Sequence, residues 1–308
     1  MKLKEAPSSK RGIARTTSSI FDPIGFLIPF ILVAKLILQE LWRSGCNWDD
    51  QVDDAALSCW KRWLDGTKFT AEIKLPRCYN TSTESIQEVQ LHVFCDASEM
   101  AYGTVAYLRF SYKTGNHKAS FLMAKSKLAP IKALTLPRLE LNSAVTAVRL
   151  FRTVIQEVDI PIERTCFWTD SVLTLQYISN KIHRPKVYVA NRQNEILESS
   201  TESQWRHVPG KVNPADILTR GVYNPSDLLK PTKEGTLWFE GPAFLKQDED
   251  SWPTLAFDSL GENDPELKKK TFLVALGIIE SSRIDTGRYS RWMTLLRIVA
   301  WLLRFAAN

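Results

Sequence analysis

The sequence predicts an α/β fold, in which helices flank a mixed β-sheet and a small helical segment precedes it. Two observations predict this class. Residues 12 to about 75 show apolar side chains at helical spacing, whereas from Val89 onward short β-branched and aromatic runs alternate with helix-like runs. With 308 residues, of which 44% are hydrophobic and 24% charged, the chain is long enough to bury a sizeable core and to form two domains.

The N-terminal segment, residues 1–85, is predicted to be helical and rich in tryptophan. Its most apolar run, residues 24–38, contains Pro29 and Lys35 and falls short of the roughly 20 residues that a membrane span requires. We therefore expect a buried helix there and no association with a membrane. The apolar side chains at helical spacing are Ile31, Ala34, Leu38 and Leu41, and the tryptophans after them are Trp42, Trp48, Trp60 and Trp63.

A polar stretch at residues 78–88 is typical of a linker or an exposed loop, which places a domain boundary near residue 85. Strand-like runs follow it, separated by turn-prone residues such as Gly103 and Gly115. Three consecutive antiparallel strands fit this pattern, at Val89–Cys95, Thr104–Phe110 and Lys118–Lys125.

The rest of the second segment, up to residue 230, alternates helices with strands. A long helical pattern covers residues 139–158, and the apolar run 165–168 predicts a buried central strand. The order β-β-β-α-β-α-α-β-α implies one mixed sheet with helices packed on it. The remaining elements are expected at Ser171 to about Asn180 (helix), Tyr188–Leu197 (helix), Gln204–Val208 (strand) and Asn213–Thr219 (helix).

Beyond about residue 230 the sequence becomes acidic and loop-like, as in Gln247-Asp-Glu-Asp-Ser. We expect a linker over residues 231–308 that ends in an amphipathic helix at residues 289–305. Arg297 and Arg304 lie between the apolar residues of that helix, which could contact either a partner or the domain itself.

Charge and cysteine content narrow the class of protein. A net charge of +6 and a pI near 9.0 suit a polyanionic partner without establishing one. The five cysteines are scattered and form no C-x-x-C pair, so neither a disulfide framework nor a zinc site is indicated. The polar N-terminus lacks the apolar region of a secretory signal, so we expect an intracellular protein in a reducing compartment.

Four acidic residues occupy places where a sheet-based fold gathers metal ligands, namely strand ends and adjacent helix starts. Asp96 ends the first predicted strand and Asp170 ends the central one, so their carboxylates lie side by side if those strands are neighbours. Glu140 heads a helical face that is otherwise apolar. Because an uncompensated buried charge is costly, a metal explains Glu140 better than an ion pair with Arg138 does.

The fourth acid, Asp216, is expected in the first turn of the last helix. Asn213 is the expected N-cap, Pro214 the first helical residue, and Gly221 follows the end. Each acid also has an ordinary explanation. An Asp after a strand commonly forms a turn, and an Asp in the first turn of a helix interacts favourably with the helix dipole. The joint occurrence of the four in this order of elements favours a metal site.

Several motifs surround these acids: Phe94-Cys-Asp-Ala-Ser, Ala101-Tyr-Gly, Ser126-Lys-Leu-Ala-Pro, Leu136-Pro-Arg-Leu-Glu-Leu, Trp168-Thr-Asp-Ser, Val189-Ala-Asn-Arg, Trp205-Arg-His-Val-Pro-Gly-Lys-Val-Asn-Pro-Ala-Asp and Thr219-Arg-Gly. In this order the region they span, about residues 89–245, resembles the ribonuclease H-like region of Pao/BEL-type LTR retrotransposon polyproteins. Upstream, Ser19-Ile-Phe-Asp-Pro-Ile-Gly resembles the thumb or connection segment of a reverse transcriptase. Downstream, Arg288-Tyr-Ser with Leu296-Arg-Ile-Val-Ala-Trp resembles the linker to an integrase zinc-binding module, so the chain resembles an internal polyprotein fragment.

The resemblance implies a ribonuclease H-like sheet of five strands and a site for two Mg²⁺ ions, or Mn²⁺, formed by Asp96, Glu140, Asp170 and Asp216. Asp96 and Asp170 would touch both ions or lie between them, Glu140 would bind one, and Asp216 the other. One ion would activate water and the other stabilise the leaving 3′-oxygen as the RNA strand of an RNA/DNA hybrid is hydrolysed. The implied partners are the hybrid and the polymerase and integrase parts of the same polyprotein. The implied location is a cytoplasmic virus-like particle, with the nucleus as the alternative.

One departure from the family pattern concerns the loop before Asp216, where many ribonucleases H carry a histidine. Here the loop reads Gly210-Lys-Val-Asn-Pro, and the nearest histidine, His207, sits in the preceding strand. Lys211 is a candidate for a phosphate or product contact instead. The candidates for nucleic-acid contacts, each of which could equally be a solvated surface charge, are Lys125, Lys127, Arg138, Lys211 and Arg220.

The strongest alternative is a catalytically inactive connection-type module that grips a template–primer duplex, although such a module needs none of the four carboxylates. A host-adopted interaction protein that kept the fold without nuclease activity is another. Asp285-Thr-Gly matches the triplet of aspartic proteases, but arginines flank it and too few residues follow for a protease fold. Asn47-Trp-Asp-Asp is expected as an exposed acidic loop, so we expect neither protease nor polymerase activity.

Overall fold

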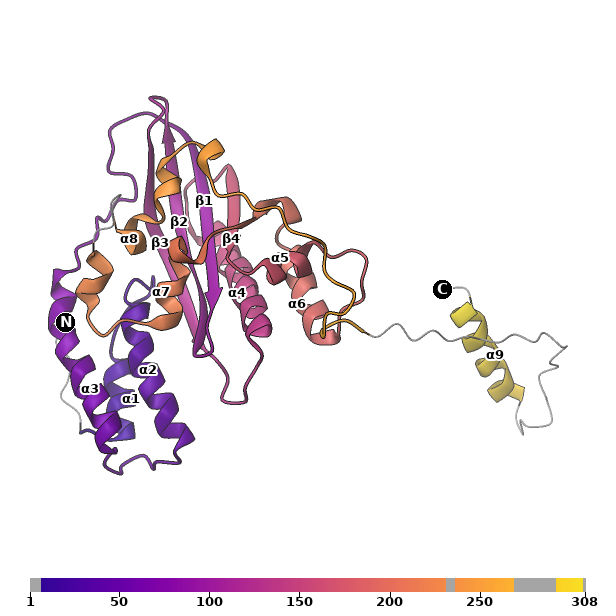
Figure 1. Cartoon of the computed structure of the whole chain (residues 1–308), viewed down its shortest axis with the longest axis horizontal. Coiled ribbons are helices and arrows are strands. Elements are labelled where there is room, and N and C mark those ends of the chain that lie inside the picture. Colours follow the sequence, from indigo (N-terminus) through magenta and orange to yellow (C-terminus); the bar gives the residue numbers. More distant parts are fainter. Residues whose placement is uncertain (1–6, 231–235, 269–291, 307–308) are drawn as a thin grey trace. The chain divides into compact units, whose positions relative to one another are not determined.

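The computed structural model describes residues 7–230, 236–268 and 292–306. The described residues up to Lys268 form one compact unit, and helix α9 (Trp292–Ala306) belongs to a second (Figure 1). Within these ranges no helix is long and apolar enough to cross a bilayer. The triplet at Asp285 and the first three residues of the predicted C-terminal helix lie outside the described residues.

Five strands of the first unit form one mixed sheet in the order β3-β2-β1-β4-β5, which confirms the predicted fold class (Figure 1). β1, β2 and β3 are antiparallel neighbours, whereas β1 with β4 and β4 with β5 are parallel. The parallel pairing requires a crossover between β3 and β4, and the long helix α4 provides it. The strands are β1 (Ile86–Ala97), β2 (Ala101–Tyr112), β3 (His117–Leu128), β4 (Arg164–Thr169) and β5 (Trp205–His207).

Side chains of β1 alternate between the two faces of the sheet and so divide the core. Leu91 and Val93 join the core under the first group of helices, whereas Phe94 joins the core on the opposite face. The first face is covered by α4 (Leu136–Glu157), α5 (Val172–Ser179) and α6 (Val187–Leu197). The opposite face is covered by α7 (Ala215–Arg220) and by residues 236–252, which include α8 (Leu237–Glu240).

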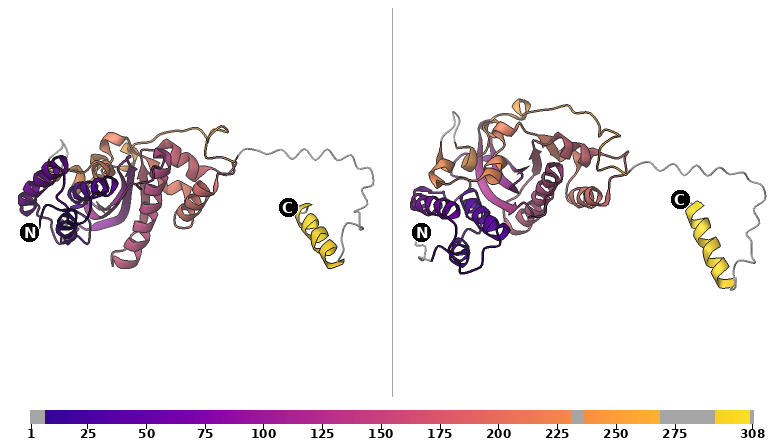
Figure 2. Two further views of the ribbon diagram at one scale, coloured as in Figure 1. Left: turned by 90° about the horizontal axis from the view of Figure 1, so that it is seen from below. Right: turned by 60° about the horizontal axis from the view of Figure 1, so that its bottom comes forward.

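The predicted helical N-terminal segment is present and has a core of its own. Trp63 stacks between Phe30 and Trp60, with ring centroids 4.7 Å and 4.8 Å away, and its indole nitrogen donates to the Phe30 carbonyl over 2.8 Å. Figure 2 shows its helices gathered beside the sheet, away from α5 and α6. They are α1 (Lys10–Ser18), α2 (Ile28–Arg43), the predicted buried helix, and α3 (Asp54–Gly66), with the 3-10 turn Thr67–Glu72 after them.

Two hydrogen bonds fasten this segment to strand β3 and to the residue that follows it. The Ala124 amide donates to the Ile24 carbonyl over 2.8 Å, and Gln39 Nε2 donates to the Ala129 carbonyl over 2.7 Å. The segment therefore packs within the same compact unit as the sheet. Its role as a thumb or connection segment, and the boundary near residue 85, stay predictions.

Residues 236–252, part of the predicted acidic and loop-like linker, pack against the sheet. Trp238, Phe244 and Trp252 are buried against the second face of the sheet. The acidic residues around them made this stretch look loop-like. Burial of the large aromatic side chains, however, gives a favourable free energy that an exposed linker would not. In this stretch the chain crosses the face of the sheet in short 3-10 turns and one helical turn.

Candidate active site

Strands β1 and β4 bring Asp96 and Asp170 to the same end of the sheet. The two strands are parallel neighbours, and Cys95 pairs with Thr169, so the next residue of each strand is one of the two acids. The sequence predicted this proximity on the condition that these strands are neighbours, and they are. Asp96 is 8% exposed, and its Oδ2 accepts a hydrogen bond of 2.7 Å from the Thr219 hydroxyl.

Glu140 lies in the first turns of α4, on the helix that crosses the first face of the sheet. Its Oε2 accepts a hydrogen bond of 2.6 Å from the hydroxyl of Ser171, the residue directly after Asp170. Ser171 also caps α5, because its Oγ accepts from the Thr174 amide over 3.1 Å. One serine thus joins the loop after β4 to the start of α4.

Asp216 lies in the first turn of α7, as expected, where its Oδ1 accepts from Arg220 Nε over 2.7 Å. The helix begins one residue later than predicted, at Ala215, and Pro214 takes the cap position. Asn213 still serves the helix start, because its Oδ1 accepts from the Ala215 amide over 3.1 Å. Its Nδ2 donates to the Cys95 carbonyl over 3.1 Å, which fixes the start of α7 against β1.

The carboxylates raise one another's pKa values. Burial, and then the charge of Asp170, raises the pKa of Asp96 to about 7, while the hydrogen bond from Thr219 opposes the shift. Burial raises the pKa of Asp170, and the charges of Glu140 and Asp216 add to it. Burial likewise raises the pKa of Glu140, with a further contribution from Asp96. No lysine or arginine is among the principal causes of these three shifts.

The chemistry of this donor set fits a divalent cation. Three largely buried carboxylates share one region in which Arg220, paired with Asp216, is the neighbouring basic group, and hard cations such as Mg²⁺ take oxygen ligands of this kind. In the part of the chain that the structure describes, however, no three acidic, histidine or cysteine side chains are arranged to hold an ion. Each of Asp96, Glu140 and Asp216 is instead turned to its own hydrogen-bond partner.

The loop between β5 and α7 passes directly against Asp170. A Cβ added to Gly210 would lie 3.0 Å from Asp170 Oδ2, so the glycine permits this close approach. The ring of His207, in β5, hydrogen-bonds to the backbone of Asp170, and burial lowers the pKa of that ring. The nearest histidine therefore lies beside the site even though the loop itself has none, while Lys211 is exposed on the loop.

The candidate nucleic-acid contacts differ in their surroundings. Lys125, Lys127 and Lys211 are exposed. Arg220 is paired with Asp216, and Arg138 donates from Nε and Nη2 to the two carboxylate oxygens of Glu266 over 2.7 Å and 3.0 Å. Their contacts to nucleic acid stay predictions.

The sequence predicted Asn213 as a helix cap and gave no role to the hydroxyl groups that orient the carboxylates. Ser171 and Thr219 lie in motifs that the sequence singled out, yet the motif alone does not say which acid each would contact. Ser98 belongs to the same group, because its hydroxyl donates to the Thr219 carbonyl over 3.0 Å and so ties the β1–β2 turn to α7. The signal was the clustering of hydroxyl and amide residues immediately beside the acids.

The sheet order and the acidic residues at the ends of its central strands define a ribonuclease H-like α/β domain. The chain belongs to the family described as the Pao retrotransposon-like RNaseH-like domain, whose model matches residues 9–171, just over half of the chain. This confirms the resemblance drawn from the motifs. The matched region includes the helical N-terminal segment together with Asp96, Glu140 and Asp170, and it ends before Asp216.

Solved structures similar to this chain include ribonucleases H and a viral polymerase. RNase H1 from the archaeon Halobacterium salinarum is 15% identical over 42% of this chain and 93% of its own, with a TM-score of 0.29. LC11-RNase H1, solved in complex with an RNA/DNA hybrid, is 16% identical over 42% of this chain and 93% of its own, with a TM-score of 0.27. A foamy viral protease–reverse transcriptase in complex with double-stranded DNA is 13% identical over 65% of this chain and 34% of its own, with a TM-score of 0.33. Among curated proteins no match was found.

Proposed function

We propose that this chain hydrolyses the RNA strand of an RNA/DNA hybrid during reverse transcription of a retroelement, with two divalent ions, Mg²⁺ or Mn²⁺, held by Asp96, Glu140, Asp170 and Asp216. One observation carries the proposal: buried carboxylates from β1, β4 and α4 raise one another's pKa values, and no basic side chain is a principal cause of these shifts. A fold that gathers like charges at such cost needs a compensating cation. Membership of the family supports the same reading.

The chain's own residues would prepare the site in three ways. Thr219 and Ser171 orient the carboxylates of Asp96 and Glu140 through their hydroxyl groups. Asn213 holds α7, and with it Asp216, against the end of β1. When bound, the divalent ions would supply a water nucleophile of lowered pKa and stabilise the charge on the leaving oxygen.

The exposed lysines near this end of the sheet would hold the substrate by its phosphates. Lys125 and Lys127 lie on β3, whose residues 125 and 127 pair with Thr104 and Tyr102 of β2 near the end of β1 that bears Asp96. Contacts to phosphate give affinity without sequence preference, which suits a nuclease that acts on any hybrid. The polymerase and integrase parts of a polyprotein, and a virus-like particle in the cytoplasm or the nucleus, belong to the same proposal.

The test is cleavage of an end-labelled RNA/DNA hybrid by the purified chain with Mg²⁺ or Mn²⁺, beside an all-RNA duplex. Asp170→Asn removes one charge from the site, and Asp65→Asn, on the exposed surface of α3, is the matched control. We expect RNA cutting that requires metal, is confined to the hybrid, is retained by the control and falls by about 100-fold or more in Asp170→Asn. Intact RNA with every variant and metal would contradict the proposal.

A second candidate function is binding of a nucleic-acid duplex without cleavage. The observation that favours it is that Asp96, Glu140 and Asp216 each accept a hydrogen bond from a protein side chain. The donor to Asp216 is Arg220. Hybrid binding that survives in the Asp170→Asn variant, together with intact RNA in the wild type, would select this candidate.

A further inference from the structure

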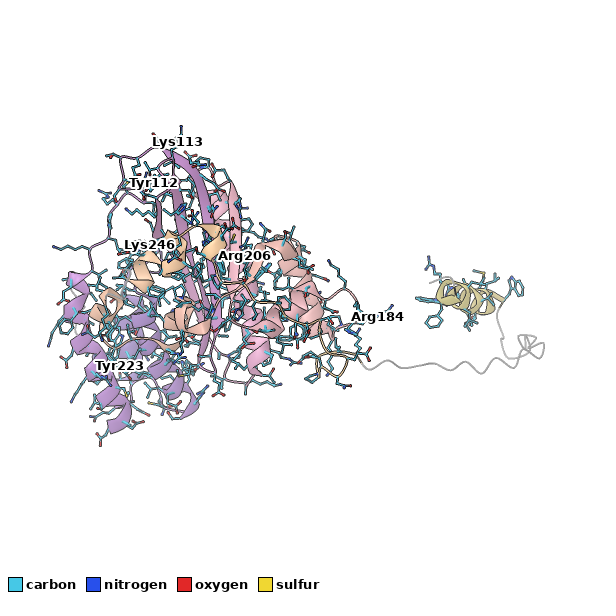
Figure 3. The ribbon with its side chains drawn as sticks, turned by 45° about the horizontal axis from the view of Figure 1, so that its top comes forward. Tyr112, Lys113, Arg184, Arg206, Tyr223 and Lys246 are labelled. Carbon is cyan, nitrogen blue, oxygen red and sulfur yellow. The ribbon has the colours of Figure 1, made fainter. Side chains whose placement is uncertain are left out.

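Residues 258–268, hereafter the acidic segment, carry Asp258, Glu262, Asp264 and Glu266 against a single basic residue, Lys268. The segment runs along α5 and α6 to the end of the described part of the first unit (Figure 1). Its backbone meets the loop before α6, because the Lys268 amide donates to the Arg184 carbonyl over 2.9 Å, and Figure 3 shows Arg184 at this edge of the unit.

Arg138 and Lys186 contact the acidic segment, and Tyr188 and Arg192 adjoin Arg138. We call these four side chains of α4, α6 and the α6 cap the α4–α6 surface. Tyr188 lies between two guanidinium groups, with Arg192 at 3.4 Å and Arg138 at 4.5 Å from its ring centroid. Lys186 Nζ donates to the Pro265 carbonyl over 2.5 Å, and the Lys186 amide donates to the Glu266 carbonyl over 2.7 Å. A surface of stacked arginines, lysine and tyrosine is the combination that binds nucleic-acid phosphates and sugars.

The central contact is between Arg138 and Glu266. The guanidinium donates to both carboxylate oxygens, over 2.7 Å and 3.0 Å, which is the bidentate geometry that arginine also uses for a phosphate. Arg138 lies two residues before Glu140 in the first turn of α4. Side chains two residues apart on a helix do not share a face, so a duplex at Glu140 would contact Arg138 with a phosphate other than the scissile one. Glu266 now occupies the guanidinium at that position.

Backbone hydrogen bonds and two core leucines hold the segment in place, so an exchange at Arg138 would involve only the Glu266 side chain. The two hydrophobic side chains of the segment, Leu260 and Leu267, are buried at 4% and 7% exposure and keep it tethered. Between them Asp264 accepts hydrogen bonds of 3.1 Å and 3.2 Å from the Tyr177 hydroxyl. The Arg138 side chain is 30% exposed and the Glu266 side chain 10%, so a competing anion can reach the pair from the Arg138 side.

We propose that the α4–α6 surface binds the phosphate backbone of an RNA/DNA hybrid and that the acidic segment is a tethered competitor that occupies it through Glu266. This deepens the proposed function, on which it rests for the identity of the substrate. Binding of a hybrid exchanges the Glu266 carboxylate on Arg138 for a phosphate. The segment stays attached through Leu260 and Leu267, so the exchange is reversible, and it weakens hybrid binding most at low salt.

The test is equilibrium binding of a fluorescent RNA/DNA hybrid to the full chain in EDTA, so that no cleavage occurs. Glu266→Gln is compared with Glu249→Gln, which weakens a bidentate pair with Arg164, with distances of 2.9 Å, and a contact with Arg206, and changes the net charge equally. We expect Glu266→Gln to bind roughly two- to fivefold more tightly at low salt and Glu249→Gln to match the wild type. The slope of log affinity against log salt should steepen by about 0.9 in Glu266→Gln, the effect of one added phosphate contact.

Two further variants separate competition from a general change of structure. Asp264→Asn loosens the segment at Tyr177 without touching Arg138, and it should tighten binding in the same direction by a smaller factor. In an Arg138→Gln background the effect of Glu266→Gln on hybrid affinity should vanish, because the guanidinium for which Glu266 and the phosphate compete is absent. Equal affinities of Glu266→Gln, Glu249→Gln and the wild type would overturn the inference.

The outcomes also separate this inference from the proposed nuclease. Tighter binding by Glu266→Gln in a chain that cuts no RNA would keep the tethered competitor and reject the nuclease. Metal-dependent cutting in a chain whose hybrid affinity does not respond to Glu266→Gln would support the nuclease and reject the tethered competitor.

Discussion

Residues 236–252 and residues 258–268 are both rich in acidic residues and poor in regular structure, yet they are attached to the molecule in different ways. The first stretch buries Trp238, Phe244 and Trp252 in the core on the second face of the sheet. The second buries two leucines and is otherwise held by hydrogen bonds and an ion pair at the surface. Both stretches therefore contribute to a core, the first with large aromatic side chains and the second with two leucines, and acidity does not distinguish a buried irregular segment from an exposed one.

The largest effect should come from removing an aromatic anchor of the first stretch. Trp238 is 1% exposed, and its Nε1 donates to the Phe26 carbonyl over 2.9 Å. Trp238→Ala leaves a cavity and an unpaired carbonyl, and we expect a loss of about 3–5 kcal/mol in the free energy of unfolding, measured by urea denaturation. Leu255→Ala, at a residue 44% exposed, is the control and should lose less than about 0.5 kcal/mol. Equal stabilities of the two variants would show that the first stretch is no more anchored than a linker.

The second prediction concerns His92, which is fully buried beneath Trp252, with ring centroids 5.1 Å apart. Trp168 Nε1 donates to His92 Nδ1 over 3.0 Å, and because an indole can only donate, the ring is neutral and carries its proton on Nε2. Burial, and then the charge of Arg109, lowers the pKa of His92 well below its ordinary value. As the pH falls below about 6.5, the unfolded chain takes up a proton that the folded chain does not, so stability should decline by up to about 1.4 kcal/mol per pH unit.

Protonation of Asp96 changes the free energy of unfolding in the opposite direction to the effect of His92. The two contributions therefore have to be measured separately. The pKa of Asp96 is raised to about 7, so the folded chain binds a proton there before the unfolded chain does, and this stabilises the fold as the pH falls. The contribution of His92 is therefore the difference between the wild type and His92→Gln, measured by denaturation from about pH 7.5 to about pH 5.5. Parallel curves for the two proteins would contradict a neutral, buried His92.

The third prediction tests the hydroxyl that joins α4 to α5, the helix against which the second stretch lies. Ser171→Ala removes both the cap of α5 and the donor to Glu140. We expect a loss of about 1 kcal/mol in stability together with weaker RNA cutting. Ser171→Thr keeps the hydroxyl and is the matched control. If Ser171→Ala had the stability and the cleavage rate of Ser171→Thr, the hydroxyl would have no part in the site.

The sheet and its helices could be predicted from the sequence because each strand and helix carries its own local period. The spacing predicted β1, β2 and β3 within a few residues of their observed ends, and it placed α4 over nearly its full length. The position of Asp96 beside Asp170 could be inferred only conditionally, because local pattern does not determine which strands pair. The parallel pairing of β1 with β4 supplied the missing condition.

Other features lay beyond local pattern because they depend on contacts between distant segments. Ser171 lies 31 residues from Glu140 in sequence, and Thr219 lies 123 residues from Asp96. Neither partner can be identified before the helices are packed on the sheet. The burial of residues 236–252 was missed for a related reason, since the apolar surface that receives Trp238 and Trp252 is built by strands far earlier in the chain.

The smallest effect should come from the polar contact of the second stretch. Gln at position 266 keeps an acceptor for Arg138, so this largely buried position, at which the Glu266 side chain is 10% exposed, loses a charge and keeps a hydrogen bond. Glu266→Gln should therefore lower the free energy of unfolding by only about 0.5–1 kcal/mol, and Glu249→Gln by a similar amount, in urea titrations of both variants beside the wild type. Such a small cost means that the contact can be exchanged without unfolding the domain. A loss as large as that of Trp238→Ala would erase the distinction between the two stretches, because Glu266 would then be part of the structural core and could not yield Arg138 to a phosphate.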